Sequence, residues 1–312
     1  MPDNTALDYV GVDIAAERLD YCVNETTEGN FPNSPTGRAE LIAKVKRLPH
    51  ARVICEASGG YEKLVVAELL AGGIEVCVVQ PGRVRAFAYA EGLLAKTDRI
   101  DARLLRRYAQ KVQLRLAVPV DAVLTTLREL LDHRRALTTQ LSEVEGRLPL
   151  AGATLAKLLG RQRTFLKKQI EQVEKTLRCH IDNDPDLRGK SERLQQIKGV
   201  GPVLASTLLA YVPELGKIGS SQLSALIGVA PHPRDSGKSH APRHVRGGRS
   251  PVRHVLYMAA VCAARCNPIL AAFYQRLKAN GKPAKVCLVA VMRKMVCLMN
   301  RLILDPTFTL AH

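Results

Sequence analysis

Residues 8–14 read D-Y-V-G-V-D-I, an alternation of apolar residues with small or polar ones that is typical of a β-strand. The stretch R-L-D-Y-C-V-N at 18–24 is interpreted as its hairpin partner. After a loop and a helical pattern over 38–48, compact apolar strands are predicted at 51–57 and 74–80, with an amphipathic helix between them. Strands that alternate with helices indicate an α/β layer architecture.

Two carboxylates lie further along, in K-T-D-R-I-D-A at 96–102. Asp98 and Asp101 are three positions apart in a helical pattern, so both side chains can point from one helix face. Nine basic residues and only three acids lie within 83–115, and two adjacent carboxylates repel each other unless a cation lies between them. A metal-dependent enzyme acting on phosphodiesters needs such a pair. The alternative is that Asp98 caps the helix or pairs with nearby arginines.

Two further acids occupy the expected strands. Asp13 interrupts the apolar run V-G-V-D-I-A, and Glu56 ends a strand in I-C-E-A-S-G-G. A charged group at the end of a buried strand is costly unless it is paired or binds a metal, although an acid there can also face solvent. The order strand, strand, helix, helix for the four acids is similar to the acidic centre of RuvC-type ribonuclease-H-like folds.

The composition favours a polyanionic partner. The 312 residues include 46 Lys and Arg against 29 Asp and Glu, a net charge of +17 that is typical of nucleic-acid-binding proteins. The lack of Trp and the 4% aromatic content favour phosphate contacts over base stacking. The sequence has neither a membrane-spanning apolar run nor a secretory signal, so we expect a cytoplasmic protein with no membrane partner. The eight cysteines, with no C-x-x-C pair, are interpreted as small buried residues.

Beyond residue 120 the pattern becomes helical. Two long amphipathic stretches predict a helical hairpin or coiled-coil arm with a structural or dimer-contact role, and 181–190 is interpreted as a linker. The stretch K-G-V-G-P at 198–202 resembles a helix-hairpin-helix, in which glycine backbone amides approach a phosphate. A tight turn between helices without a ligand is the alternative.

A basic stretch at 231–254 contains Ser236 next to Gly237 in an expected flexible loop. A serine in such a loop usually donates a hydrogen bond to phosphate, and it becomes a nucleophile only when a base, a metal or surrounding charge activates it. Ser239 and Ser250 are nearby competitors. The predicted nucleic-acid contacts of the chain are Lys96, Arg99, Arg103, Lys198, Gly199, Gly201, Arg234, Lys238, Arg243, Arg246, Arg249 and Arg253.

Taken together, the chain resembles the DEDD transposases of the insertion-sequence family one hundred and ten, which are similar to the Piv-type DNA invertases. The resemblance covers nearly the whole chain and is carried, in this order, by V-G-V-D-I-A, E-A-S-G-G-Y-E, K-T-D-R-I-D-A, I-K-G-V-G-P, G-V-A-P-H-P-R-D-S-G-K and R-H-V-L-Y-M-A-A. It implies a RuvC-like (ribonuclease-H-like) catalytic domain at 1–118, a coiled-coil arm at 119–185, and a mainly α-helical transposase domain at 186–312. It also implies that Ser236 is the nucleophile and that four acids bind the metal: Asp13, Glu56, Asp98 and Asp101.

The same resemblance implies a transposase or site-specific recombinase that cuts and rejoins donor and target double-stranded DNA through a covalent phosphoserine, with Mg²⁺ or Mn²⁺ as cofactor. It further implies guidance by a structured noncoding RNA of the element, the bridge RNA, and assembly into a homo-oligomer, a dimer or tetramer. Two other readings stay open. One is a RuvC-like metal-dependent nuclease or junction resolvase whose acids activate water, and the other is a non-catalytic nucleic-acid scaffold.

Overall fold

The computed structural model describes residues 7–93, 98–119, 121–232, 235–236, 239–240 and 244–310. At 98–100, 232, 235–236 and 239–240 it describes the backbone alone. The chain forms two compact units, Met1–Val120 and Asp121–His312.

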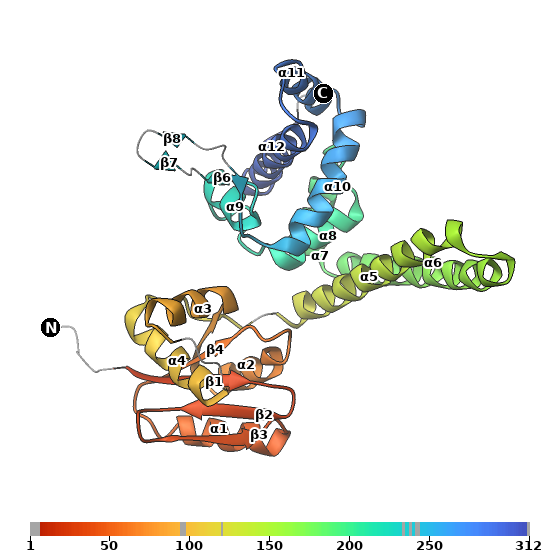
Figure 1. Cartoon of the computed structure of the whole chain (residues 1–312). Coiled ribbons are helices and arrows are strands. Elements are labelled where there is room, and N and C mark those ends of the chain that lie inside the picture. Colours follow the sequence, from red (N-terminus) through yellow and green to blue (C-terminus); the bar gives the residue numbers. More distant parts are fainter. Residues whose placement is uncertain are drawn as a thin grey trace. The chain divides into compact units, whose positions relative to one another are not determined.

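The first unit is built on a five-stranded mixed sheet with the strand order β3-β2-β1-β4-β5 (Figure 1). β3, β2 and β1 are successive antiparallel neighbours, whereas β4 and β5 run parallel to β1. The sequence does not predict β3, because Gly29 and Pro32 are poor strand formers, but β3 lies at the sheet edge, where proline is tolerated. The strands are β1 (Asp8–Ile14), β2 (Arg18–Cys22), β3 (Glu28–Pro32), β4 (Ala51–Glu56) and β5 (Glu75–Val79).

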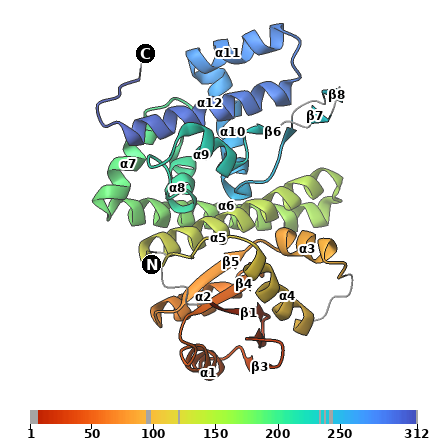
Figure 2. The ribbon, with the colours of Figure 1, turned by 90° about the vertical axis from the view of Figure 1, so that its left-hand side faces the viewer.

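Helices cover both faces of this sheet, which confirms the expected α/β layers (Figure 2). On one face, α1 and α2 bury Leu41 and Leu69 against Val12. On the other, α3 and α4 pack Leu105 and their other apolar residues around Ile54. The helices are α1 (Pro35–Val45), α2 (Glu62–Ala71), α3 (Pro81–Ala90) and α4 (Asp98–Lys111). The sequence pattern does not predict α3, because its Pro-Gly start has the composition of a turn, yet proline is favoured in the first turn of a helix.

Helix α4 lies directly against strand β1 at Gly11. A Cβ atom at Gly11 would lie 2.0 Å from the carbonyl oxygen of Ala102 and 2.8 Å from the amide nitrogen of Arg106. Both atoms belong to the helix backbone, which cannot rotate away as a side chain can. Glycine at this position therefore sets the distance between the helix and the sheet.

We expect Gly11→Ala to destabilise the first unit by roughly 1–3 kcal/mol, because the added methyl group overpacks a rigid contact. Thermal unfolding followed by circular dichroism should show a Tm lower by roughly 5–10 °C. Gly82→Ala in α3 is the matched control, since a Cβ there has nothing within 4 Å. Equal stability of Gly11→Ala and the wild type would show that α4 does not lie this close to β1.

The second unit begins with two long helices, α5 and α6, which lie side by side (Figure 1). Leu159, Leu166 and Val173 repeat at seven-residue spacing and are buried toward α5, as in a coiled coil. This pair is the predicted helical hairpin. The remaining elements complete a mainly helical unit, as expected: α5 (Ala122–Arg147), η1 (Leu148–Leu150), α6 (Ala153–Asp182), α7 (Pro185–Gln195), α8 (Pro202–Tyr211), α9 (Ser220–Ile227), β6 (Pro231–His232), β7 (Asp235–Ser236), β8 (Ser239–His240), β9 (His244–Val245), α10 (Ser250–Cys266), α11 (Pro268–Ala279) and α12 (Ala284–Leu304).

The predicted linker at 181–190 is wrong. α6 continues to Asp182, and α7 begins at Pro185 after a gap of two residues. The side chain of Asp184 accepts hydrogen bonds from the backbone N–H groups of Asp186 and Leu187, so it caps α7. Asp, Asn and Pro are common both in loops and at helix ends, and here they mark the boundary between α6 and α7.

One apolar core runs through the second unit. It joins the arm helices to the helices that follow them, with Leu127, Leu208, Leu256 and Met295 all buried in one cluster. Among the described residues, no single helix is both long and apolar enough to cross a membrane. α10 and α11 meet the length and composition only as a pair, and they are bent by 95° at their junction.

Candidate active site

Asp13 and Glu56 are neighbours at one end of the sheet. Val12 and Cys55 are partners in the parallel register of β1 and β4, so Asp13 and Glu56 come next along the two strands. Alternate residues of a strand share a face, and Ile54, two positions before Glu56, packs toward α4. Both half-buried carboxylates therefore project on the α4 face, from strands about 5 Å apart.

The first turn of α4 lies at the same end of the sheet. Gly11 contacts α4 at Ala102, and after the helix Ala117 donates a hydrogen bond to the carbonyl of Val76, near the beginning of β5. α4 therefore runs antiparallel to β1, β4 and β5, with its beginning near the strand ends. Asp98 is the first residue of α4 and Asp101 lies in the same turn. The topology thus brings all four predicted acids to one end of the sheet.

A further carboxylate, which the sequence analysis did not predict, lies next to Asp13 on the neighbouring strand. Asp20 on β2 is the antiparallel partner of Asp13, and directly paired residues share a face. Asp20 is only 5% exposed and accepts a hydrogen bond of 2.7 Å from Nε of Arg18. The hairpin register, which pairs L-D-Y with V-D-I, is the signal that would have found it. Asp20 is an ion-paired neighbour of the acidic centre.

The loop after Glu56 is held by another acid that the sequence analysis did not single out. Glu62 accepts hydrogen bonds from the backbone N–H groups of Ser58, at 3.1 Å, and Gly60, at 2.8 Å. Gly59 and Gly60 have φ values of 73° and 113°, which favour glycine. E-A-S-G-G-Y-E therefore forms a fixed turn at the end of β4, and this turn positions Glu56.

The donor atoms at this end of the sheet suit a hard divalent cation. Carboxylate oxygens are the ligands that Mg²⁺ and Mn²⁺ prefer, and Asp13 and Glu56 supply them from adjacent strands. Among the described side chains, no three His, Cys, Asp or Glu residues form a group that could hold a metal ion. The side chain of Asp98, the predicted ligand on the first turn of α4, lies outside that description.

Ser236 belongs to the second unit. The sequence predicts a flexible loop, whereas the structure contains two short antiparallel ladders, β6 with β9 and β7 with β8. Ser236 in β7 is paired with Ser239 in β8. The described residues thus place Ser236 on a hairpin that projects beyond a second ladder (Figure 1).

Ser236 and Ser239 face each other in the β7–β8 ladder, which we call the serine hairpin. Close backbone contact holds together the two ends of the longer segment that contains it. A Cβ on Gly228 would lie 2.2 Å from the carbonyl oxygen of Gly247, and a Cβ on Gly248 would lie 2.3 Å from the amide nitrogen of Gly228. Only glycine permits this approach. The backbone N–H of Arg249 also donates a hydrogen bond to the carbonyl of Leu226, which adds a second backbone contact next to these glycines.

Arg249, a predicted nucleic-acid contact, also forms a two-point ion pair with Glu214. Its Nη1 and Nη2 donate to the two carboxylate oxygens at 2.6 and 2.7 Å. This hydrogen bonding from Arg249 lowers the pKa of Glu214 below its usual value of 4.5, against the effect of partial burial. The pair fixes the residue that precedes α10.

We expect Arg249→Gln to cost about 1 kcal/mol of stability at neutral pH, a modest value because water partly screens both groups. A carboxyl whose pKa is lowered by folding contributes stability above its unfolded pKa and loses it as pH falls through the folded pKa. The difference in unfolding free energy between variant and wild type should therefore shrink below about pH 4.5. Urea unfolding at a series of pH values measures it, and a difference that stays constant with pH would contradict the role of the ion pair.

The other predicted nucleic-acid contacts divide into two groups. Arg103 donates to Glu28 at 2.6 Å, Arg253 donates to the carbonyl of Gly247, and Arg246 is exposed. Outside the described residues lie Lys96, Arg234, Lys238 and Arg243, together with the side chain of Arg99.

The predicted phosphate-binding hairpin at 198–201 joins α7 to α8. Gly199 has a φ of 104° and lies against α10, where a Cβ would be 2.5 Å from Cβ of Ala263. The carbonyl of Lys198 accepts a hydrogen bond from Asn267. Gly201 is the residue before the first turn of α8. The hairpin is therefore docked on α10, with its backbone in the conformation that glycine favours.

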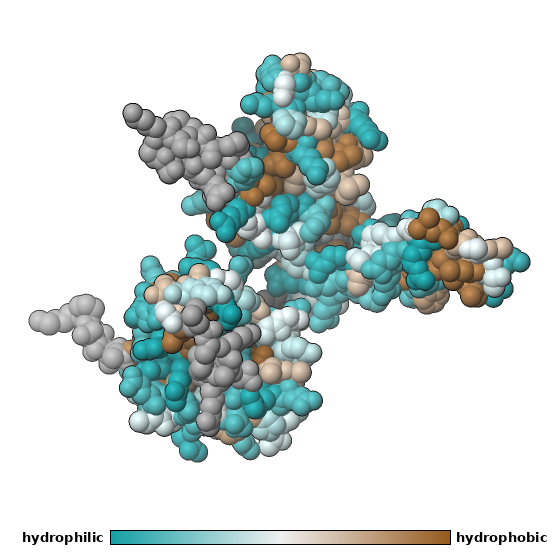
Figure 3. All heavy atoms as spheres, in the orientation of Figure 1, coloured by the Kyte–Doolittle hydropathy of each residue, from teal (hydrophilic) through white to brown (hydrophobic). Residues whose placement is uncertain are grey.

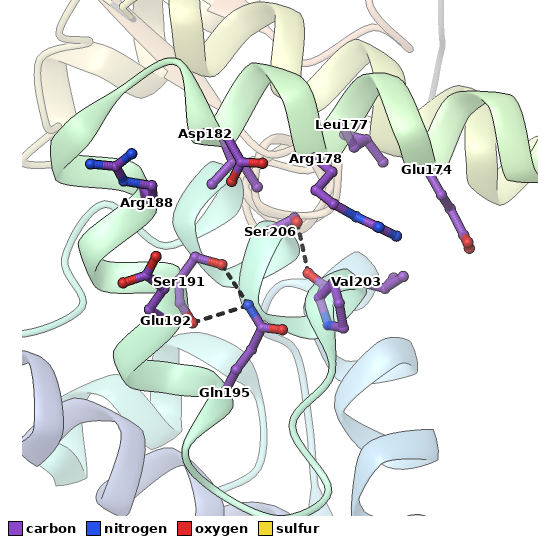
Figure 4. Close-up of a pocket in the computed structure, with 12 residues that line it drawn as sticks. Glu174, Leu177, Arg178, Asp182, Arg188, Ser191, Glu192, Gln195, Val203 and Ser206 are labelled. Atoms are coloured by element: carbon purple, nitrogen blue, oxygen red, sulfur yellow. Dashed lines mark hydrogen bonds between the residues drawn. The ribbon is translucent and has the colours of Figure 1, made fainter.

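A cavity of about 470 Å³ lies elsewhere in the second unit, between α6, α7 and α8 (Figure 4). Three of its polar side chains form local hydrogen bonds. Gln195 donates to the hydroxyl of Ser191, and Ser206 donates to the backbone carbonyl of Pro202. The cavity contains none of the predicted catalytic residues.

Comparison with known proteins gives a consistent result over both units. Residues 10–149 match the DEDD family model for IS110, described as "Transposase", and residues 191–275 match the model described as "Transposase IS116/IS110/IS902 family". The chain is similar to the pilin gene-inverting protein of Moraxella lacunata, with 27% identity over 299 residues that cover 92% of this chain and 93% of the relative. The pilin gene-inverting protein of Moraxella bovis is 26% identical with the same coverage.

Proposed function

The chain belongs to the IS110 family of transposases, and we propose on that premise that it cuts and rejoins DNA through a covalent phosphoserine at Ser236. Family membership and the similarity to pilin gene-inverting proteins support a DNA transposase or recombinase. The observation that carries the finer proposal is the meeting of Asp13, Glu56 and the first turn of α4 at one end of a mixed sheet. This arrangement supports a RuvC-like catalytic domain.

The proposed reaction conserves the phosphodiester bond energy. Oγ of Ser236 attacks the phosphorus of a DNA phosphodiester, the bond to one deoxyribose oxygen breaks, and that oxygen leaves as a hydroxyl after taking up a proton. A hydroxyl from another DNA end then attacks the same phosphorus and displaces Ser236. The strand is thereby rejoined without ATP, and the serine is restored.

The acids have a separate task. The carboxylates would hold Mg²⁺ or Mn²⁺, and the bound ion would supply positive charge that polarises the phosphate and stabilises the charge developing on it. The residues proposed to hold the ion are Asp13, Glu56, Asp98 and Asp101. These acids belong to the first unit, whereas Ser236 belongs to the second, and we propose that the reaction needs both.

Charge and family membership support the proposed nucleic-acid partners. We propose that the net charge of +17 serves to hold donor and target duplexes together with a structured guide RNA. The glycine hairpin at 198–201 and the basic residues around the serine hairpin are the proposed phosphate contacts. Binding dominated by such contacts weakens steeply with salt.

The arm is the proposed surface for assembly with a second copy of the chain. Hydrophobic surface gathers toward the far end of the α5–α6 pair (Figure 3). Leu155, Leu158 and Phe165 share one face of α6 and are 44%, 57% and 60% exposed, and Leu150 nearby is 89% exposed. Such a patch is unusual on a surface that contacts only water.

We therefore expect Leu158→Glu combined with Phe165→Lys to shift the protein toward the monomer, because charges on an apolar contact must be desolvated. Light scattering across a concentration series measures the mass. The exposed Leu304, on α12, gives a control when changed to Glu. An unchanged mass in the arm variant would remove the arm from the proposed assembly surface.

The test of the proposed reaction combines purified protein, Mg²⁺, the noncoding RNA flanking the element, and labelled donor and target DNA, resolved on a denaturing gel. A labelled protein–DNA band supports the phosphoserine. Cleavage that leaves a free 5′-phosphate without an adduct supports the metal-dependent nuclease instead. Binding without strand cleavage under any metal condition supports a scaffold.

A further inference from the structure

The C-terminal end of α10 carries two exposed thiols that the proposed reaction does not use. The sequence predicts that the cysteines are buried, but Cys179, Cys262 and Cys266 are exposed. Cys262 and Cys266 are four positions apart on α10, and their Sγ atoms are 3.8 Å apart. Both side chains therefore project from the same helix face and converge.

This spacing fits a shared metal ion. Two thiolates bound to one tetrahedral Zn²⁺ at about 2.3 Å each lie about 3.8 Å apart. The same two sulfurs do not fit a disulfide as well, because an S–S bond is about 2.05 Å long and brings the Cβ atoms to roughly 3.5–4.5 Å. Residues four apart on a helix hold their Cβ atoms about 5–6 Å apart, so a disulfide would distort α10.

The surroundings hold this pair in place. Ala263, next to Cys262, lies against Gly199 of the 198–201 hairpin. Asn267, next to Cys266, donates one hydrogen bond to the carbonyl of Lys198 and caps α11 with another. The thiols consequently lie on a helix end that is fixed from two directions and open to solvent.

The exposed stripe that contains the thiols is rich in soft ligands. His254, Met258, Cys262 and Cys266 follow one another at four-residue spacing, and all four are exposed. Thiolate and thioether sulfur and imidazole nitrogen bind borderline or soft cations, whereas the carboxylates of the first unit suit hard ones. The ligands on α10 and the carboxylates of the first unit therefore favour different metal ions.

We propose that Cys262 and Cys266 form a two-thiolate site for a thiophilic divalent cation such as Zn²⁺, separate from the acidic centre. On binding, each S–H bond releases its proton, two sulfur–metal bonds form, and water leaves the cation. Water fills the remaining positions of the tetrahedron, so the affinity is lower than that of a closed four-ligand zinc site.

The surroundings of Cys266 favour its protonated thiol in the metal-free protein. Burial and the hydrogen bond with Cys262 raise the pKa of Cys266, while the charge of Lys198 acts in the opposite direction. Proton release on metal addition is therefore a direct sign of thiolate coordination.

The test is a titration of the reduced full chain with Cd²⁺, a spectroscopic substitute for Zn²⁺, in excess Mg²⁺. The wild type should develop ultraviolet thiolate-to-metal absorbance that saturates at one equivalent, with release of protons, and added Zn²⁺ should displace it. Cys262→Ser and Cys266→Ser should each weaken binding by at least about tenfold. Both positions are exposed, so the variants should keep the fold.

Cys179→Ser is the matched control, because Cys179 is exposed but belongs to another helix, α6. Its titration should equal that of the wild type, and so should that of Asp13→Asn, which alters only the acidic centre. The proposal is overturned if the wild type develops no thiolate absorbance, or if the absorbance survives in Cys262→Ser and Cys266→Ser.

Discussion

Asp13→Asn is expected to reduce DNA cleavage and rejoining by on the order of 10³-fold or more, which corresponds to several kcal/mol of lost transition-state stabilisation. Asn has nearly the same size as Asp but lacks the charge that binds a hard cation. The proposed metal site would then have one charged ligand fewer, and Glu56 would be the remaining carboxylate from the two adjacent strands. The rate of strand cleavage as a function of Mg²⁺ concentration measures the effect.

Asp20→Asn is the informative control for this variant. Asp20 pairs with Asp13 in register and is buried, but its carboxylate is engaged by Arg18. We expect a much smaller loss, of roughly tenfold, because Asp20 acts on the acidic centre from outside it. Unfolding curves identify any variant whose loss comes from the fold. Full activity of Asp13→Asn would remove the acids from the mechanism and support the scaffold interpretation.

Ser236→Ala is expected to abolish the covalent protein–DNA adduct and to lower recombination by on the order of 10⁴-fold or more, since no other group forms the ester. Adduct and cleavage must be measured separately on the same gel. If cleavage survives in Ser236→Ala but is lost in Asp13→Asn, water is the nucleophile and the protein is a metal-dependent nuclease.

Ser239→Ala provides the comparison within the same hairpin. Ser239 is the register partner of Ser236. Each substitution therefore removes one serine hydroxyl, from paired positions of the same short ladder. Ser239→Ala should retain the adduct. Loss of the adduct in Ser239→Ala but not in Ser236→Ala would transfer the nucleophile to the facing strand.

The sequence predicts the framework of the first unit because 8–14 alternates apolar with small or polar residues and 51–57 and 74–80 are compact apolar runs. β1, β4 and β5 agree with their predicted ranges to within about a residue at each end. The pattern fails for β3, whose Gly29 and Pro32 suit a loop, and for α3, whose Pro81 suits a turn. Both elements form because proline is tolerated at a sheet edge and is favoured in the first turn of a helix.

Part of the acidic site can be predicted from the sequence. The order strand, strand, helix, helix of the four acids is similar to that of a RuvC-type acidic centre, and the register of β1 and β4 places Asp13 and Glu56 on adjacent strands. Asp20 was not predicted because its place beside Asp13 depends on the register of the β1–β2 hairpin. A shift of one residue in that register would turn the side chain of Asp20 to the opposite face of the sheet. Pairwise contacts of this kind follow from the fold, and composition alone does not contain them.

The glycine contact beneath the serine hairpin has a consequence for engineering. Gly228 and Gly248 bring the two ends of the intervening segment together by contacts that lie at its margins, and the Arg249–Glu214 pair secures one side. Closing a longer segment on such a base costs little, since each doubling of loop length adds only about 0.6 kcal/mol. We therefore expect a change in the length of the segment that contains β7 and β8 to cost less stability than a substitution at Gly228 or Gly248.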